Sequence, residues 1–366
     1  MKLQIGVLFG GCSTEHDISI ITGLQVMHNL DPKKYNIIPL YLTKDNEILS
    51  HRKLLNIDFY KQDIKTKGIT YTIYFNKGAG WLSNISKKFH FRKKIDLIFN
   101  CTHGYRVEDG TISGLLNYLK IPYSSPDILT SSICQDKDYT KIILKELNVP
   151  VLDYIVLKEK DKLDLEYYSR MIEYPVIIKP AHLGSSIGIK IAYDYNELLD
   201  GVNYGFIYDN KLIIEKYLND SVEYSVALYK RKNDLIISRI EEISKTKEIF
   251  DFKDKYIDFN KTDNHIYLDD DSELAKKIKE ISKKVYNKLE MKGIIRIDFI
   301  KSNDLFLNEI NTIPGSLANY LFKNISFKTL LDEQVREMLY EYKYNQRYKT
   351  SFETSVLNNN YKFYKK

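Results

Sequence analysis

The sequence predicts an α/β protein with more than one domain. Its 366 residues are enough for two or three domains of about 150 residues each. Apolar strands alternate with helices through the first third of the chain, a pattern typical of a parallel sheet that binds ligands at the carboxyl ends of its strands. Hydrophobic residues make up 43% of the chain and charged residues 28%, and these proportions exclude an intrinsically disordered polypeptide.

Composition excludes several classes of protein. The 3 cysteines are odd in number and lack CxxC spacing, so neither a disulfide scaffold nor a zinc site is expected. No apolar run reaches the roughly 18 residues of a membrane helix, and the N-terminal apolar segment is too short for a signal peptide. We therefore expect a cytoplasmic protein with no membrane partner. The formal net charge is +6, but basic and acidic residues are interleaved, so nucleic acid is not an expected partner.

Residues 1–125 are expected to form a Rossmann-like domain. A short apolar strand runs into Gly10-Gly11-Cys12-Ser13, where glycines permit a tight turn before the following helix. A later buried strand ends at Cys101-Thr102-His103-Gly104, and the helix after it carries apolar residues on one face. The expected elements are strands over 4–9, 37–42 and 95–100, helices over 17–30 and 112–119, and a polar, loop-like stretch over 43–94 with a short hairpin near 71–75.

Two further domains are expected over 126–210 and 211–345, followed by a polar tail over 346–366. Two strands of the last domain alternate apolar and polar residues as antiparallel strands do, and a long polar segment over 245–270 has the character of a functional loop. The expected elements are helices over 137–147, 161–173, 272–289 and 327–342, and strands over 151–157, 176–179, 212–215, 223–228, 235–242, 295–300 and 305–310.

The strongest pattern for chemistry lies in the last expected hairpin. Residues two apart in a strand share a face, so Arg296 and Asp298 point the same way, as do Glu309 and Asn311. Two carboxylates and an amide supply the oxygen ligands that Mg²⁺ prefers beside nucleotide phosphates. The guanidinium can stabilise a transferring phosphoryl group. A solvated, salt-bridged hairpin is the alternative, and the adjacent Pro314-Gly315 favours a site.

A second pattern is typical of phosphate binding. Lys179 precedes the segment Gly184-Ser185-Ser186-Ile187-Gly188, whose small residues let backbone N–H groups approach phosphate oxygens. Such a segment can also be a simple tight turn. Lys137 begins the preceding helix and offers a second cation, with a solvated side chain as the alternative.

Two residues of the first domain follow strands directly. Glu15 stands at the start of a helix, where it can hold a substrate ammonium or simply face the positive end of the helix dipole. His103 follows a buried strand and is either a ligand-binding or a structural histidine.

An ordered series of motifs carries a family resemblance. The chain contains GGCSTEHDIS, HGYRVEDG, Asp136-Lys137, YPVIIKPAHLGSSIG, IIEKYL, FDFKDKY, RIDF and NEINTIPG. This series, over about residues 3–340, resembles the D-alanine–D-alanine ligase family of ATP-grasp enzymes, including its vancomycin-resistance relatives. The resemblance implies a three-domain α/β ATP-grasp fold with an N-terminal Rossmann-like domain. It also implies an ATP-dependent ligase, a cytoplasmic homodimer that joins D-alanine to a second D-amino acid through an acyl phosphate for peptidoglycan precursors.

The resemblance also implies roles for individual residues. ATP would be bound by Lys137, Lys179, Ser186, Glu215, Tyr217, Leu218, Glu223 and Lys255. Two Mg²⁺ ions, which Mn²⁺ can replace, would be held by Asp298, Glu309 and Asn311. Catalysis would depend on Glu15, Ser185, Tyr256, Arg296 and Gly315. The two amino-acid substrates would contact Glu15, His103, Tyr320 and Leu321.

Departures from the family pattern leave the second substrate open. Val107 replaces a usual glycine, Ser113 a usual glutamine, and Tyr320 a usual serine near the carboxylate of the second substrate. D-alanine, D-serine and other acceptors therefore remain as alternatives, although Tyr256 matches the members that use an amine. A nucleic-acid-binding protein on a degenerate ATP-grasp scaffold is an alternative of another class, and the intact set of charged residues in the hairpin argues against it.

Overall fold

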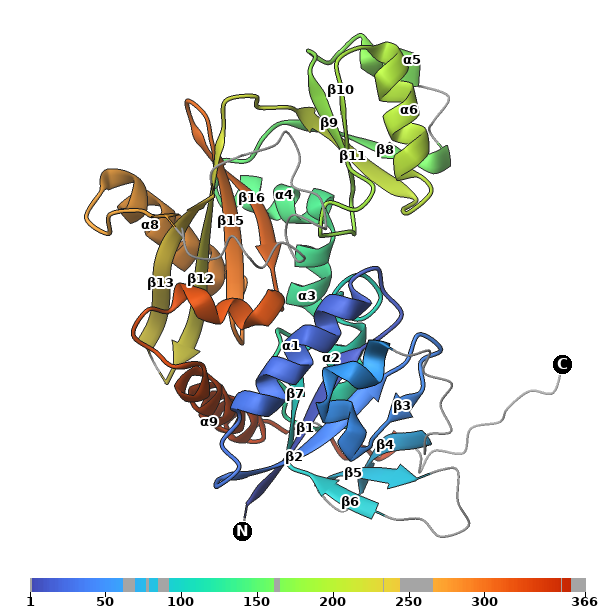
Figure 1. Cartoon of the computed structure of the whole chain (residues 1–366), viewed down its shortest axis with the longest axis vertical. Coiled ribbons are helices and arrows are strands. Elements are labelled where there is room, and N and C mark those ends of the chain that lie inside the picture. The colour runs from blue at the N-terminus through green and yellow to red at the C-terminus, as the bar shows by residue number, and fades with distance from the viewer. Residues whose placement is uncertain are drawn as a thin grey trace, which may run out of the picture.

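Three β-sheets organise the chain (Figure 1). The computed structural model describes residues 2–61, 70–76, 79–84, 92–160, 165–232, 234–243, 266–349 and 351–356. Within these residues, sheets of seven, four and five strands follow one another along the sequence. The predicted α/β class is confirmed.

The first sheet has a parallel half and an antiparallel half. β1 (Leu3–Gly10) pairs in parallel with β2 (Tyr35–Leu42) and β7 (Leu97–Asn100). The stretch expected to be mostly loop-like after β2 instead continues the sheet through antiparallel pairs, because its aromatic and β-branched residues favour strands. These added elements are β3 (Ile48–Leu49), β4 (Thr70–Asn76), β5 (Ala79–Asn84) and β6 (Arg92–Ile95), with the short 3-10 helices η1 (Arg52–Leu55) and η2 (Ile57–Lys61) between β3 and β4.

Helices α1 (His16–Asn29) and α2 (Thr111–Tyr118) pack into two separate cores of this sheet. Val7 and Phe9 of β1 pack with Leu24 of α1, whereas Leu8 packs with Leu116 of α2. This division follows from the alternation of side chains along a strand. The loops that enter both helices therefore lie at the carboxyl edge of β1 and β7, where ligands bind in such sheets.

The second sheet is antiparallel and has the order β10-β9-β11-β8. Its strands are β8 (Tyr154–Lys158), β9 (Val176–Pro180), β10 (Lys190–Ala192) and β11 (Lys211–Lys216), and α5 (Leu165–Ser169) and α6 (Tyr195–Gly205) share its core. The expected domain boundary after residue 210 falls one strand too early, because β11 pairs with both β8 and β9.

The third sheet is also antiparallel and has the order β14-β13-β12-β15-β16. Its elements are β12 (Val222–Arg231), β13 (Asp234–Ile243), β14 (Ile266–Tyr267), α8 (Glu273–Lys288), β15 (Ile295–Lys301) and β16 (Leu305–Asn311). Helices α3 (Ile128–Gln135) and α4 (Lys137–Glu146) were expected to belong with the second sheet. They instead contribute Cys134 and Leu144 to the core of the third sheet, beside Ile297.

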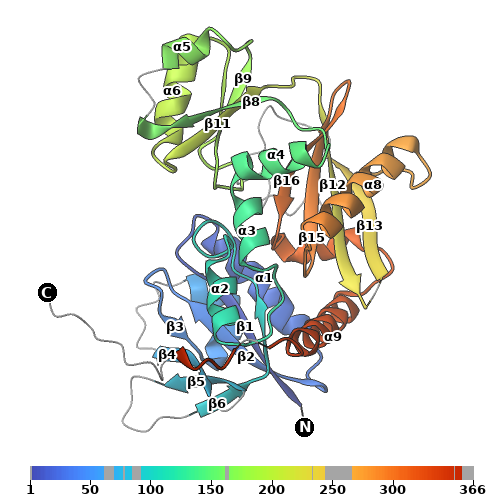
Figure 2. The same ribbon diagram turned by 180° about the vertical axis from the view of Figure 1, so that it is seen from behind.

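Two C-terminal helices join the third sheet to the first. η5 (Gly315–Leu321) and α9 (Phe327–Asn345) contribute Leu321 and Leu331 to the core that contains Phe9 and Leu24. Seen from behind, α9 lies between the two sheets (Figure 2). None of the helices in the described part of the chain is both long and apolar enough to cross a lipid bilayer.

Candidate active site

A pocket of about 550 Å³, including space open to solvent, lies where parts of all three sheets meet. Loops after β1 and β7, the segment after β9 and the end of β16 contribute to its walls. Of the residues expected in the site, the pocket brings together Glu15, His103, Lys137, Arg296, Glu309, Asn311 and Gly315. Segments nearly 300 residues apart in the chain therefore share one cavity.

Glu15 lies between the first and second sheets. Ser185, in the glycine loop (residues 184–188), donates a hydrogen bond from Oγ to Glu15 Oε1. A Cβ atom on Gly104 would lie 3.0 Å from Glu15 Oε2, and one on Gly184 would lie 3.2 Å from the same carboxylate. The backbone of both glycines therefore approaches Glu15 closely, and the carboxylate at the pocket wall is suited to bind an ammonium group.

Glu108 is a pocket residue for which no role was expected. Its Oε2 accepts a hydrogen bond from Gly104 N at 3.0 Å, and its Oε1 accepts from Thr312 Oγ1 and Ile313 N, each at 2.9 Å. Burial, followed by the charge of Glu15, raises the pKa of Glu108 to about 7 in spite of these donors. The sequence signal for Glu108 was its place in HGYRVEDG, directly after a buried strand.

His103 is a buried, uncharged member of the pocket. Its Nε2 lies 2.9 Å from Thr22 Oγ1 of α1. Burial, assisted by the positive charge of Arg296, lowers the pKa of His103 to about 4. The imidazole is therefore neutral at pH 7, and hydrogen bonds to Thr22 and to the backbone of Ile313 hold it at the pocket wall.

The hairpin of β15 and β16 places four expected side chains on one face. Arg296 pairs with Asn311 and Asp298 pairs with Glu309 across the strands, and a β-bulge follows directly. Asp298 accepts hydrogen bonds from Arg296 Nη2 at 2.8 Å, from Asn311 Nδ2 at 2.8 Å and from Ser225 Oγ at 2.7 Å. These contacts fix the orientation of the guanidinium at the pocket.

The donor set of this hairpin fits a divalent cation shared with a nucleotide. Among the described residues, no three His, Cys, Asp or Glu side chains gather into a metal site. The two carboxylates and the amide of Asp298, Glu309 and Asn311 would therefore need further oxygen ligands. Mg²⁺ usually takes one or two carboxylates together with substrate phosphates, so the residues present suit a metal held jointly with polyphosphate.

A buried ion triad holds one of the two expected phosphate-binding lysines. Lys179 Nζ lies 2.6 Å from Glu215 Oε2, and Lys141 Nζ lies 2.6 Å from Glu215 Oε1. Burial favours the neutral form of Glu215, but the two ammonium groups outweigh it and hold the pKa at about 2. Burial on its own lowers the pKa of Lys179. The negative charges of Glu215, Glu309 and Glu223 outweigh burial, so this pKa is raised overall.

The sequence patterns did not indicate a role for Lys141. It lies one helical turn after Lys137 in α4, a spacing that places both lysines on one side of the helix. Lys137 itself donates a hydrogen bond from Nζ to Leu183 O beside the glycine loop. The start of α4 is thus attached to the second sheet by two cations.

The glycine loop has an unusual backbone. Ser185 and Ser186 have φ angles of 55° and 58°, in the left-handed region that residues other than glycine rarely adopt. Such conformations persist only where the surrounding structure holds them, and they cluster at functional sites. The hydrogen bond of Ser185 to Glu15 is one of the contacts that holds this loop.

Other expected site residues lie outside the pocket wall. Tyr217 and Leu218 form the connection between the second and third sheets, where Tyr217 N donates to Pro175 O at 2.9 Å. Tyr320 is close enough to Arg296 for the two to interact, and burial raises its pKa to about 12. The side chain of Leu321 is fully buried in the hydrophobic core, and its contact with a substrate stays a prediction. Lys255 and Tyr256 lie outside the described residues.

Comparison with known proteins identifies the family. The family models described as "D-ala D-ala ligase N-terminus" and "D-ala D-ala ligase C-terminus" match residues 4–126 and 143–333. The chain belongs to the D-alanine–D-alanine ligase family. A D-alanine–D-alanine ligase of Thermosipho africanus is 38% identical over 344 residues, which cover 91% of this chain and 92% of the relative.

Solved ligases share the whole architecture. The D-alanine–D-alanine ligase of Helicobacter pylori superposes with a TM-score of 0.77 at 29% identity, covering 91% of this chain and 98% of that ligase. The VanG D-Ala:D-Ser ligase of Enterococcus faecalis gives 0.74 at 27%, covering 92% and 100%. A ligase of Bacillus anthracis complexed with ATP gives 0.65 at 25%, covering 93% and 99%. The three-sheet arrangement is therefore the ATP-grasp fold of this ligase family.

Replacing Glu215 by glutamine should destabilise the protein strongly. The change leaves Lys141 and Lys179 buried without a carboxylate, and breaking a buried ion pair in this way costs about 3 kcal/mol or more. Urea unfolding followed by circular dichroism measures the loss in the free energy of unfolding. Glu166→Gln, which breaks the exposed pair with Arg170, is the control and should change little.

The same residue predicts a response to acid. Because the pKa of Glu215 is lower in the folded chain, at about 2, than its ordinary value of 4.5, its contribution is complete above pH 4.5 and is lost as the pH falls towards 2. The stability gap between wild type and Glu215→Gln should therefore narrow over this interval. A gap that is independent of pH would contradict the ionised state of Glu215.

Proposed function

We propose that the chain is an ATP-dependent ligase that joins D-alanine to a second D-amino acid, for the synthesis of peptidoglycan precursors. The family membership carries this proposal. It is supported by a pocket in which an ammonium-binding carboxylate, phosphate-binding cations and a carboxylate–amide hairpin lie together. The bound ATP of the Bacillus anthracis relative supports the choice of nucleotide.

In the first step, the carboxylate of D-alanine attacks the γ-phosphorus of ATP. The product is an acyl phosphate, and ADP leaves. Glu15 binds the ammonium group of D-alanine, with Ser185 orienting its carboxylate, and His103 lies near the D-alanine carboxylate. Lys137 and Lys179 bind phosphates, and the glycine loop covers them with backbone N–H groups.

In the second step, the amine of the acceptor attacks the acyl carbon. The tetrahedral intermediate collapses to the peptide and inorganic phosphate. Arg296, fixed by Asp298, and the backbone of Gly315 stabilise the negative charge that develops on oxygen. Asp298, Glu309 and Asn311 would hold two Mg²⁺ ions, for which Mn²⁺ can substitute, and the metal would neutralise phosphate charge.

Further residues are proposed to surround the nucleotide, and the enzyme is proposed to form a dimer. Tyr217 and Leu218 of the connection between the second and third sheets, and Glu223 of β12, border the nucleotide, with Ser186 on its phosphates. We place the enzyme in the cytoplasm as a homodimer, and exposed apolar side chains on α2 and α3, among them Tyr118 and Leu129, support self-association. No nucleic acid or membrane takes part. Light scattering of the purified chain tests the dimer.

D-serine is a second candidate acceptor. Tyr320 stands where the family pattern has serine, and the D-Ala:D-Ser ligase VanG shares the architecture of this chain. A phenol beside Arg296 reduces the space for an acceptor. D-alanine is nevertheless the preferred acceptor, because the curated relatives that match over nine tenths of the chain are D-alanine–D-alanine ligases.

Glu309→Gln should abolish turnover while the fold survives. A neutral amide cannot offset metal and phosphate charge as a carboxylate does, and losing an electrostatic interaction of the transition state costs about 10²-fold or more in rate. ADP release with ATP, D-alanine and saturating Mg²⁺ measures the effect. Asp304→Asn, at the exposed turn of the same hairpin, should retain wild-type rates. Near wild-type turnover of Glu309→Gln would exclude the metal assignment.

Arg296→Lys should lose most of its kcat with little change in the affinity for ATP. A guanidinium can hold two oxygen atoms at once, whereas an ammonium is a point charge. Steady-state kinetics together with calorimetric titration of ADP separate the two parameters. An unchanged kcat would remove Arg296 from the mechanism, and an equal loss in ADP affinity would assign it to nucleotide binding instead.

The product should be a D-alanyl dipeptide, with little D-alanyl-D-lactate near neutral pH. The Glu15–Ser185 contact keeps the pocket wall polar at this point, which suits an acceptor that arrives as an ammonium. Competition of D-alanine, D-serine and D-lactate, read by mass spectrometry, should rank them in that order. Tyr320→Ser should change the KM of the acceptor but not of ATP, whereas Tyr340→Ser, an exposed tyrosine of α9, should change neither. A dominant D-lactate ester would refute this ranking.

A further inference from the structure

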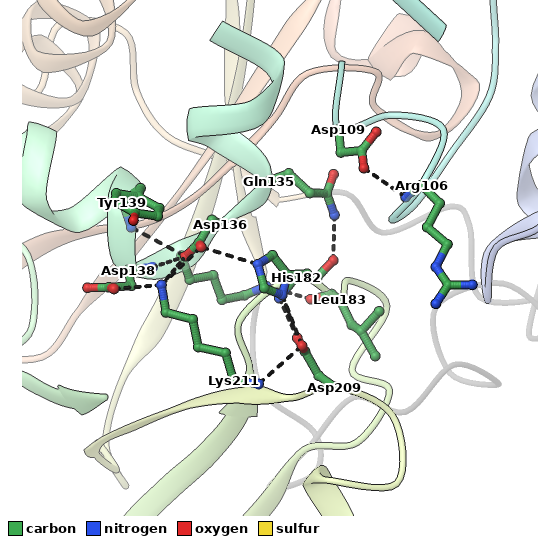
Figure 3. A network of polar contacts seen from close by, with 11 residues as sticks. Arg106, Asp109, Gln135, Asp136, Asp138, Tyr139, His182, Leu183, Asp209 and Lys211 are labelled. Atoms are coloured by element: carbon green, nitrogen blue, oxygen red, sulfur yellow. Dashed lines mark hydrogen bonds and ion pairs between the residues drawn. The ribbon is translucent and has the colours of Figure 1, made fainter. Parts of the chain in front are cut away.

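A histidine outside the pocket wall connects several elements around the expected nucleotide site. The imidazole of His182 lies between two carboxylates, with Nδ1 2.9 Å from Asp209 Oδ1 and Nε2 3.2 Å from Asp136 Oδ2 (Figure 3). Its ring also stacks on Tyr105 of the first sheet's loop, with centroids 4.8 Å apart and an interplanar angle of 18°. One side chain thus contacts α4, the second sheet and the N-terminal domain.

The backbone around His182 is attached to the α3–α4 junction at three consecutive carbonyl groups. Ala181 O accepts from Lys137 N at 3.0 Å, His182 O accepts from the side chain of Gln135, and Leu183 O accepts from Lys137 Nζ. The segment leads directly into Gly184, the first residue of the glycine loop. Whatever fixes residues 181–183 therefore fixes both the base of the glycine loop and the ammonium of Lys137.

The charges around His182 favour an imidazolium. Asp136 and Asp209 face its two nitrogens, and Lys211 pairs with Asp136 at 3.0 Å and with Asp138 at 2.6 Å. On the side of the N-terminal domain, the guanidinium of Arg106 lies 5.9 Å from the centroid of the Tyr105 ring, which stacks on His182.

Burial alone lowers the pKa of His182, but its hydrogen bonds to Asp136 and Asp209 raise it to about 9. Burial on its own raises the pKa of Asp136. The hydrogen bonds from His182 and Lys211 outweigh burial and lower this pKa to about 2. The ring is therefore cationic at pH 7, and three carboxylates share two cations in this cluster.

We propose that His182 is a positioning residue for nucleotide binding, an imidazolium that bridges Asp136 and Asp209 and so holds the glycine loop and Lys137 in the geometry that receives polyphosphate. The proposal rests on the ATP-dependent function proposed above. Removing the cation would leave two carboxylates facing each other across the base of the loop. Their repulsion would loosen residues 181–183. A displacement of about 1 Å in a positioning group can lower a catalytic rate by up to about 10²-fold.

The proposal predicts how nucleotide affinity depends on pH. Although burial disfavours the charged form, the hydrogen bonds to Asp136 and Asp209 raise the pKa of His182 to about 9, so the ring in the folded chain loses its charge as the pH rises through about 9. The affinity for ADP should therefore be steady near pH 7 and fall as the pH rises through about 9. The phosphate groups of ADP, whose last pKa is about 6, are fully ionised there, so the nucleotide itself does not cause the change.

Titration calorimetry with ADP and Mg²⁺ between pH 6.5 and 10 tests the proposal. His182→Asn should bind ADP at least about tenfold more weakly at pH 7 and should lose the pH-dependent component. Asp209→Asn removes one carboxylate that raises the pKa of His182. The affinity of this variant for ADP should therefore begin to fall at a lower pH than that of the wild type. The matched controls are His28→Asn and Asp153→Asn, an exposed histidine and an exposed ion-pair partner of α4, which should behave as wild type.

Several outcomes would overturn the proposal. A His182→Asn variant with reduced thermal stability but unchanged ADP affinity would show a purely structural role. The NMR titration of the His182 ring in the wild type does not depend on the folding of any variant, and a midpoint at or below 6.5 would refute the imidazolium bridge. Wild-type protein that binds no ADP at any pH would instead refute the proposed function itself, and the positioning role with it.

Discussion

The assembly of the pocket depends on the buried carboxylate of Glu108. A buried carboxyl group costs free energy unless hydrogen bonds replace the water that it loses. For Glu108 the donors come from two sheets: Gly104 N follows β7 in the first, and Thr312 Oγ1 and Ile313 N follow β16 in the third. Glu108 is therefore satisfied only when these two sheets are docked. Docking of these two sheets therefore completes the hydrogen bonds of Glu108 at the pocket wall.

The cations in and beside the pocket are each paired within the protein itself. Arg296 is paired with Asp298, Lys179 with Glu215, and Lys137 donates to the carbonyl of Leu183. Because each partner is part of a sheet or loop with its own hydrogen bonds, these positive groups need little reorganisation to meet the charge of a phosphoryl group. Preorganised charge of this kind is the largest contribution to catalysis in many enzymes. The cost is an excess of carboxylates at the site, which a phosphate-bound divalent cation would offset.

Sequence patterns predicted those features that depend on neighbours in the chain. The shared face of Arg296 and Asp298 follows from strand alternation, and the resemblance marked seven of the residues that line the pocket. The pairing of Asp298 with Glu309 and the bulge after it depend on strand register, which the sequence does not encode locally. The assignment of α3 and α4 to the third sheet depends on which core accepts Leu144. Glu108 and Lys141 were missed for the same reason, because their partners lie up to 205 residues away.

Helix α1 and its N-cap residue contact two segments that have strained backbones. Ser185 and Ser186 of the glycine loop, and Ser316, Leu317 and Ala318 of η5, all have positive φ angles of 47° to 58°. Strained conformations of this kind persist only when contacts from outside the loop fix them. Ser185 donates to Glu15, the N-cap residue of α1, and Thr22 Oγ1 within α1 accepts from Ser316 N at 3.1 Å.

Glu15 precedes the first helical residue of α1, and Thr22 lies about two turns further along the helix. His103 also contacts Thr22, so the group expected near the first substrate's carboxylate is fixed to the same helix as both loops. The glycine loop and the segment at Ser316 are thus both attached to one helix, most of whose residues are buried. Because a helix changes length far less than a loop changes shape, attachment to one helix restricts the relative movement of these two strained segments.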